Sequence, residues 1–338
     1  MNSIQEVAPG IFRIRQTLSR FKFLVNIYLL AGEDGLVFDS GFGSQRAGNS
    51  LVNAITRIAD RCETRGHPCT VTRAMTSHGH WDHFSGLAHL KHQLGLEILA
   101  TERQALKISI KQNYRHFYWG DLQLFDAQMT VGSDPWRCIR NHCLNAFCIA
   151  LLRIRFVSGR ITRVSHHQLL RVNGRNWEVL PVPGHCDDDI ALFNRETGIL
   201  LGGDLVFRGT TTWMGPMKSD LDKYLQSLTY IRQLPGLKLI LPAHGSPITD
   251  PRPRLTATIE HLNKRTAKVL QFVLAGGPQG VSFDTLYQSF FPGKSLQRAL
   301  LGGWIVITLK HLLQQREITL VQKGRTLLFQ PATQGGIP

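Results

Sequence analysis

The chain has 338 residues, more than one average domain, which indicates two domains. Hydrophobic residues make up 43% of it and its mean hydropathy is -0.10, values typical of a globular protein in water. No apolar run approaches the ~20 residues of a membrane helix, so the sequence argues against a membrane-spanning class and predicts no membrane partner.

The formal net charge of +15 favours anionic partners, such as nucleic acid, phosphorylated metabolites or another anionic substrate. A basic surface without such a role is an equal alternative, because net charge says nothing about geometry. The N-terminus lacks an apolar segment with a cleavage signature, and the six cysteines form no dense disulfide pattern for this length. We therefore expect a cytoplasmic protein with reduced thiols.

In the N-terminal three quarters of the chain, apolar alternation and turn residues predict many strands with few helices between them. The expected strands lie at 10–15, 24–30, 36–39, 70–76, 97–100, 168–172, 177–182, 190–193, 199–202 and 237–241. Helical spacing predicts helices at 49–59, 85–94 and 221–234. The stretch 101–165 is less regular and partly arginine-rich, so it could line a substrate entrance or be plain solvated surface.

Three histidines and one aspartate fall within six positions directly after the strand expected at 70–76. They are His78, His80, Asp82 and His83. Imidazole nitrogen and carboxylate oxygen suit zinc, and iron or manganese accept the same ligands. Two histidines spaced two apart can turn towards one point, while Asp82 and His83 can serve a second point beside it. The cluster therefore predicts a metal site.

Three later segments share one feature with this cluster: a strand ends and a His or Asp follows, next to Gly or Pro. These residues are His185, Asp204 and His244. Ligands on loops at strand ends can converge on one edge of a sheet while the strands hold them rigid. A neighbouring glycine lets the backbone turn sharply and approach closely.

The character of the sequence changes at Pro251-Arg252-Pro253, which we interpret as a linker between a domain at 1–250 and a domain at 251–338. Helices are expected at 254–274, 283–290 and 296–315, and a hairpin at 318–321 and 326–329. This order is typical of a small winged-helix-like domain. Its basic charge could serve nucleic-acid contact, but we favour a dimerisation or lid module, which would make the protein a homodimer or cover its site.

The His-x-His-x-Asp-His run, Gly184-His185, Gly203-Asp204 and Ala243-His244-Gly245 together resemble the metallo-β-lactamase superfamily over roughly residues 10–250. The resemblance implies an α/β (α+β) fold, the αββα sandwich. It also implies two zinc ions. His78, His80 and His185 would hold one ion, Asp82, His83 and His244 the other, and Asp204 would bridge them. Asp39, at an earlier strand end, would support the site without binding metal.

The resemblance implies a hydrolase in which two cations lower the pKa of a shared water, so that hydroxide attacks an ester, thioester, lactone or phosphodiester. Asp82 is the candidate to orient this nucleophile and shuttle its proton, besides being a ligand. Aspartate at position 204, where some true zinc β-lactamases have cysteine, argues against that subclass. Three acids, Asp187 to Asp189, follow His185 where many relatives have a second histidine.

The order of the two domains is similar to the lactamase-beta-like-2 group, some of whose members are single-strand endoribonucleases. The segments 203–211 and 224–228, and the run His261 to Arg265, carry this similarity. Cleavage of single-stranded RNA is therefore one alternative function. A second alternative is a regulatory or binding metalloprotein with little turnover.

Overall fold

The computed structural model describes residues 3–18, 23–115, 149–215, 218–293, 302–324 and 326–332. One sheet has seven strands that pair in chain order. They are β1 (Ser3–Ala8), β2 (Ile11–Leu18), β3 (Phe23–Leu30), β4 (Gly35–Phe38), β5 (Val71–Met75), β6 (Glu97–Ala100) and β7 (Thr162–Arg163). Strands β1 to β4 pair antiparallel and β4 to β7 pair parallel. All five strands expected in this part are confirmed.

A second sheet has five strands in the order β12-β11-β10-β9-β8. They are β8 (Leu169–Val172), β9 (Arg175–Pro181), β10 (Ile190–Asn194), β11 (Ile199–Gly203) and β12 (Leu239–Pro242). Strands β9 and β11 both pair antiparallel with β10, and β11 pairs parallel with β12. The carboxyl ends of β9, β11 and β12 therefore meet at one edge of the sheet, as expected for convergent ligand loops.

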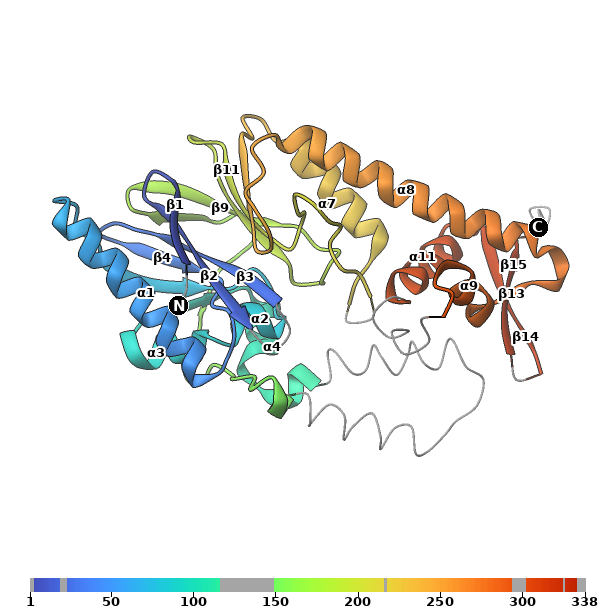
Figure 1. The fold of residues 1–338 in the computed structure, drawn as a ribbon, viewed down its shortest axis with the longest axis horizontal. Helices are drawn as coiled ribbons and strands as arrows, with labels where there is room; N and C mark the ends of the chain where they lie inside the picture. Colours follow the sequence, from blue (N-terminus) through green and yellow to red (C-terminus); the bar gives the residue numbers. More distant parts are fainter. Residues whose placement is uncertain are drawn as a thin grey trace.

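Helices cover the outer faces of the two sheets (Figure 1). They are α1 (Gln45–Thr64), α2 (Trp81–Phe84), α3 (Leu87–Leu94) and α4 (Glu102–Ser109) beside the first sheet, and α7 (Leu221–Gln233) beside the second. The single helix expected at 85–94 is preceded by α2, a short turn within the histidine cluster. A Cβ at Gly86, between α2 and α3, would lie 2.1 Å from the Ser40 carbonyl oxygen, so this close approach requires glycine.

Three hydrophobic clusters separate these layers. Leu51, Ile55 and Leu90 of α1 and α3 pack on the outer face of the first sheet. A second cluster joins the inner faces of both sheets, with Phe38 and Leu192 fully or almost fully buried. A third lies between the second sheet and α7 together with the helix that follows β12. Helix, sheet, sheet and helix thus stack in order, which confirms the αββα sandwich.

The helix after β12 is α8 (Pro251–Ala275), which runs from the sandwich to the C-terminal part (Figure 1). Pro251-Arg252-Pro253 is not an extended linker but the first turn of α8. Proline suits this turn because the N–H groups there have no partner within the helix. Leu255 and Leu262 of α8 belong to the cluster on the second sheet, whereas Val269 and Val273 belong to a separate C-terminal cluster. One helix therefore contributes to both cores.

The C-terminal part contains η2 (Gly277–Gln279), α9 (Phe283–Phe290), α11 (Gly303–Gln314) and a sheet in the order β13-β15-β14. The strands are β13 (Val281–Ser282), β14 (Ile318–Lys323) and β15 (Thr326–Pro331). The expected hairpin is confirmed, and α11 occupies the second half of the helix expected at 296–315, whose first half falls mainly on residues 294–301, outside the described ones. The assignment as a winged-helix-like domain with its boundary at residue 250 stays a prediction.

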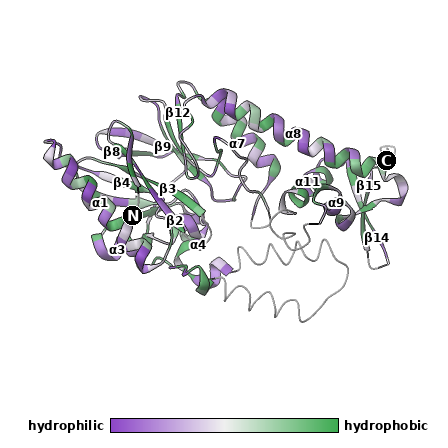
Figure 2. Ribbon diagram, in the orientation of Figure 1, coloured by the Kyte–Doolittle hydropathy of each residue, from purple (hydrophilic) through white to green (hydrophobic). Residues whose placement is uncertain are grey.

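Hydrophilic and hydrophobic residues alternate along α1 and α8, as in helices that pack one face against a core (Figure 2). Within the described residues, no helix combines the length and apolar character needed to span a bilayer. The irregular arginine-rich stretch lies in part at 116–148, outside the described residues.

Candidate metal centre

The structure brings all seven predicted residues together from four strand ends. The run His78 to His83 follows β5, and His185, Asp204 and His244 follow β9, β11 and β12. Their donor atoms form a first group of His78, His80 and His185 and a second group of Asp82, His83 and His244, each with its atoms within 4.8 Å of one another. The set of His78, His83 and Asp204 is equally close and overlaps both groups. The sequence thus identified the residues that converge, and the sheet topology explains why they do.

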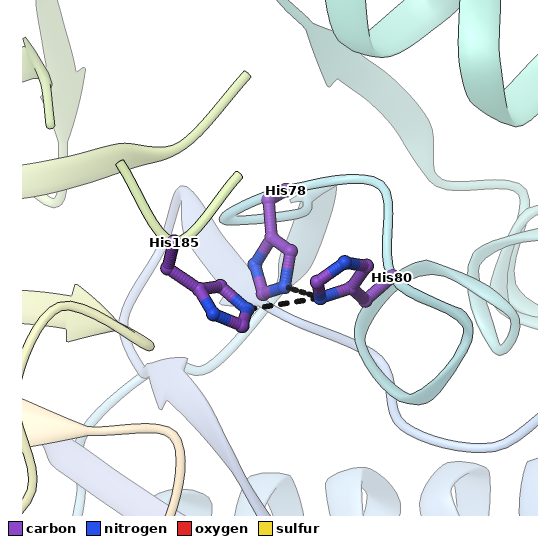
Figure 3. Close-up of side chains that lie close together, drawn as sticks. All are labelled: His78, His80 and His185. Carbon is purple, nitrogen blue, oxygen red and sulfur yellow. Dashed lines mark hydrogen bonds between the residues drawn. The ribbon is translucent and has the colours of Figure 1, made fainter. Parts of the chain in front are cut away.

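The first group consists of three imidazole rings that point at one spot (Figure 3). Nδ1 of His80 lies 2.8 Å from Nε2 of His78 and 2.9 Å from Nε2 of His185. The rings of His80 and His185 meet edge to face at 84°. Three ring nitrogens therefore converge closely enough to share one bound cation.

Backbone carbonyl groups fix which nitrogen of two histidines faces the centre. Nδ1 of His185 lies 2.7 Å from the Trp213 carbonyl oxygen, and Nδ1 of His244 lies 2.6 Å from that of Leu24. A carbonyl oxygen can only accept, so each Nδ1 must donate a proton and each Nε2 keeps its lone pair. Both lone pairs then point into the cluster, the orientation that metal-binding histidines need.

The second group places ring nitrogens against carboxylate oxygens. An oxygen of Asp82 lies 3.3 Å from Nε2 of His83 and 3.4 Å from Nε2 of His244. Asp204 lies between the groups: one oxygen is 3.5 Å from His83 and 3.4 Å from His244, and the other is 3.4 Å from Nε2 of His185. Asp204 therefore lies between the two groups, and its role as a bridge between two ions stays a prediction.

A divalent cation would suit this donor set. Nε2 of His83 and Oδ1 of Asp204 are buried and have no hydrogen-bond partner within the part of the chain that the structure describes. Buried acceptors that face one another are costly unless a cation or a proton lies between them. Nitrogen and oxygen donors in overlapping three-membered groups match zinc, iron or manganese, and the geometry does not choose among these metals.

The electrostatics of the two groups differ. Burial lowers the pKa of His80 to about 3 and that of His185 to about 4, so both rings are neutral near pH 7, the form that binds a metal. Burial alone would also lower the pKa of His83, but the carboxylates of Asp82, Asp204 and Asp39 outweigh it and raise that pKa well above its ordinary value. The second group is thus a strongly anionic environment.

Asp39 supports the cluster from outside, as expected. It adopts a left-handed backbone conformation with φ 65°, which is strained for a residue other than glycine. One oxygen accepts a hydrogen bond from the Ser77 backbone N–H at 2.7 Å, and the other lies 3.2 Å from Nδ1 of His83. Asp39 therefore fixes both the loop after β5 and the ring of His83.

Aromatic rings surround His244, and sequence reasoning missed them. The ring of Phe23 lies 5.1 Å from that of His244, and the ring of Phe207 lies 5.2 Å from it. Trp81 stacks on Phe23 at 6.1 Å and contacts Phe42 at 5.4 Å. Phe23 is 39% exposed, so part of this aromatic wall is open to a bound molecule. The adjacency of Trp81 to His80 was the one signal in the sequence.

Gly184, next to His185, is packed against α7. Its φ is +146°, and an added Cβ would lie 2.3 Å from the Cα of Tyr224. We expect Gly184→Ala to reduce the free energy of unfolding by about 2–4 kcal/mol, through backbone strain and overpacking. Urea unfolding of the variant would measure the loss. Gly209→Ala is the matched control, because a Cβ there would meet no described atom within 4 Å; equal stability of both variants would contradict the packing seen here.

Comparisons with known proteins agree with this fold. A family model described as the Metallo-beta-lactamase superfamily matches residues 20–244. Acyl-coenzyme A thioesterase MBLAC2 of Gallus gallus is 26% identical over 243 residues, which cover 70% of this chain and 78% of that protein. Atrochrysone carboxyl ACP thioesterase of Passalora fulva is 23% identical over 283 residues, which cover 82% of this chain and 66% of that protein.

Among solved structures, a Beta-lactamase domain protein from Burkholderia ambifaria has a TM-score of 0.75 and 19% sequence identity, covering 98% of this chain and 95% of that chain. This likeness shows a shared fold. With the family match over residues 20–244, the chain belongs to the metallo-β-lactamase superfamily. Membership in this superfamily of hydrolases confirms the expected class of enzyme.

Proposed function

We propose that this chain is a hydrolase that binds two divalent metal ions, with zinc as the proposed metal, and cleaves a thioester. One observation carries the metal part of the proposal: ring nitrogens oriented by backbone carbonyls point at carboxylate oxygens in a buried cluster, which is unfavourable unless a metal ion or a proton lies between them. His78, His80 and His185 would hold one ion, and Asp82, His83 and His244 the other, with Asp204 shared. Such ions would supply Lewis acidity and acidify a water molecule at neutral pH.

The chain's own residues would orient the reactants. Asp82 is buried at the junction of His83 and His244, where its carboxylate can accept a hydrogen bond from the attacking water and take up its proton. The water oxygen would bond to the thioester carbonyl carbon, the carbon–sulfur bond would break, and the proton would leave with the thiol. Hydrogen bonds from His185 to Trp213 and from His244 to Leu24 keep both rings in place during these steps.

The aromatic wall favours a substrate whose acyl group is apolar. Phe23, Trp81 and Phe207 present ring carbon beside His244, where an acyl chain next to the reacting carbonyl would lie. Two relatives with thioesterase names support the same substrate class. The basic charge of +15 would in addition attract an anionic carrier such as a phosphorylated thiol.

A substrate screen on the purified, metal-loaded protein would test the proposal. Acyl thioesters, lactones, simple esters, a β-lactam and labelled single-stranded RNA would be compared at equal metal content. We expect the largest kcat/KM for an acyl thioester. Absence of thioester cleavage in a protein shown to contain two metals would end the thioesterase proposal.

Single-stranded RNA remains the second candidate, because the net charge of +15 suits a polyanion. It predicts that RNA cleavage exceeds thioester hydrolysis and weakens steeply as salt concentration rises. Intact RNA beside rapid thioester turnover would remove this candidate. Metal binding without turnover of any substrate would instead favour the regulatory metalloprotein.

The aromatic wall yields a further prediction. We expect Phe23→Ala to raise KM about 10-fold for a long-chain acyl thioester and much less for an acetyl thioester, because only the long chain reaches the lost ring. Steady-state kinetics with a series of acyl lengths would measure this. Tyr230→Ala removes a comparably exposed ring from α7 and serves as the control. A uniform KM across chain lengths in Phe23→Ala would place the acyl group elsewhere.

A further inference from the structure

Helix α4 faces the metal cluster from behind with two fully buried polar residues. Gln104 and Lys107 are three positions apart, so they lie on the same side of the helix, and both have 0% exposure. A capping box between Thr101 and Gln104 fixes the start of α4. A buried ammonium group is costly unless it is fully paired, so the position of Lys107 must be compensated by its partners.

Gln104 joins two loops that carry predicted metal ligands. Its Nε2 lies 2.9 Å from the Ser77 carbonyl oxygen, 3.2 Å from that of Thr76 and 3.1 Å from that of Asp188. Its Oε1 accepts a hydrogen bond from the Thr101 backbone N–H at 3.0 Å. One side chain thus connects the loop after β5 to the loop after β9.

Lys107 holds the second of these loops. Its ammonium group donates to Asp187, lies 2.6 Å from Asp188 Oδ1, and is 3.4 Å from the sulfur of Cys186. Burial alone would lower the pKa of Lys107, but the two carboxylates outweigh burial and raise it, so the ammonium form persists. The three residues that contact Lys107 directly follow His185 in the sequence.

The two loops must keep a fixed distance for the first cluster to form. His78 and His80 belong to one loop and His185 to the other. Nδ1 of His80 lies 2.8 Å from Nε2 of His78 and 2.9 Å from Nε2 of His185. At the sheet edge, the Ile190 N–H donates a hydrogen bond to the Ser77 carbonyl oxygen at 2.9 Å. Helix α4 adds a second support, because its side chains bond to both loops. A shift of the loop after β9 would move His185 directly.

We propose that Gln104 and Lys107 are positioning residues that hold the His185 loop against the His78–His80 loop and so set the metal affinity of the first cluster. The inference rests on the proposed function to the extent that this cluster binds a metal. Both side chains bond to residues that neighbour these histidines in the sequence, so they act on the cluster through the two loops. Supports of this kind change metal affinity by about 10- to 100-fold.

Metal affinity measured by competition with a chromophoric chelator would test the proposal, with zinc as the metal. We expect Lys107→Met and Gln104→Leu each to weaken one of two sites about 10- to 100-fold and leave the other nearly unchanged. The visible spectrum of the cobalt(II)-loaded variants should change in the bands of that site alone. Arg103→Ala is the control, because Arg103 also pairs with Asp187 but lies at the surface of α4, its side chain 52% exposed.

A second variant separates positioning from folding. Lys107→Met leaves Asp188 buried without its cation, so it could unfold the protein. Lys107→Met combined with Asp188→Asn removes both charges of that buried pair, while Asp187 keeps its pair with Arg103, so the fold is expected to persist. We expect the double variant to show the same loss of metal affinity as the single one. Wild-type affinity in a folded double variant and in Gln104→Leu would overturn the inference. Failure of the wild-type protein to bind metal would instead overturn the proposed function together with it.

Discussion

Asp204→Ala is expected to reduce the metal content below one ion per chain and to lower kcat/KM at least about 10³-fold. The reason is the central position of Asp204, whose two oxygens face His185 on one side and His83 and His244 on the other. Its removal takes one negative charge from both clusters at once. Elemental analysis of the purified variant, followed by kinetics with the best substrate, would measure both effects.

The control for this variant is Asp60→Ala, which removes an exposed carboxylate from α1 at no cost to the cluster. It should keep two ions and full activity. The apo forms of Asp204→Ala and the wild type should unfold at similar urea concentrations, because Oδ1 of Asp204 accepts no hydrogen bond from the described residues. Two retained ions in Asp204→Ala would show that the two groups bind metal independently and that Asp204 is no bridge.

The convergent residues could be predicted because each lies in a recognisable local sequence pattern. His78 to His83, His185, Asp204 and His244 each follow an apolar run and lie beside a glycine or proline, and parallel strands deliver their carboxyl ends to one edge. The local sequence pattern and the sheet topology therefore identify the same convergent residues. The pairing of β9 and β11 through β10 was not needed for this prediction, but it explains the outcome.

The supports of the site could not be predicted, because they depend on contacts between distant segments. Asn26 lies within the strand expected at 24–30, yet its side-chain amide donates to the carbonyls of Pro242 and Gly245, both at 2.9 Å, and so holds the loop of His244. Lys107 is charged and gives no sequence signal of burial, because its partners lie about 80 positions away. The aromatic wall likewise combines rings from four separate segments.

The proline motif shows the opposite error, in which a local signal was read too simply. Prolines at 251 and 253 interrupt a strand pattern, which favoured a linker. Proline is equally suited to the first turn of a helix, and the helix that starts there extends to Ala275. Sequence alone does not distinguish these uses, whereas the packing of Leu255 against the second sheet does.

Asp82→Asn is expected to lower kcat about 10²- to 10⁴-fold with a much smaller change in KM, because it keeps the shape of the side chain and removes its proton acceptor. One oxygen of Asp82 lies 3.3 Å from Nε2 of His83 and 3.4 Å from Nε2 of His244, and the aromatic wall lies beside His244.

Single-turnover kinetics on a variant whose metal content has been measured would separate a slower chemical step from a lost ion. Asp82→Asn is expected to retain the ion of the His78, His80 and His185 group, which contains no Asp82 oxygen. Glu196→Gln, an exposed acid on the β10–β11 turn, controls for the change of net charge. Two retained ions and an unchanged kcat in Asp82→Asn would assign the proton transfer to another group. If the cellular function also persisted, the regulatory metalloprotein would become the better explanation, because a binding role needs the metal cluster but not the proton acceptor.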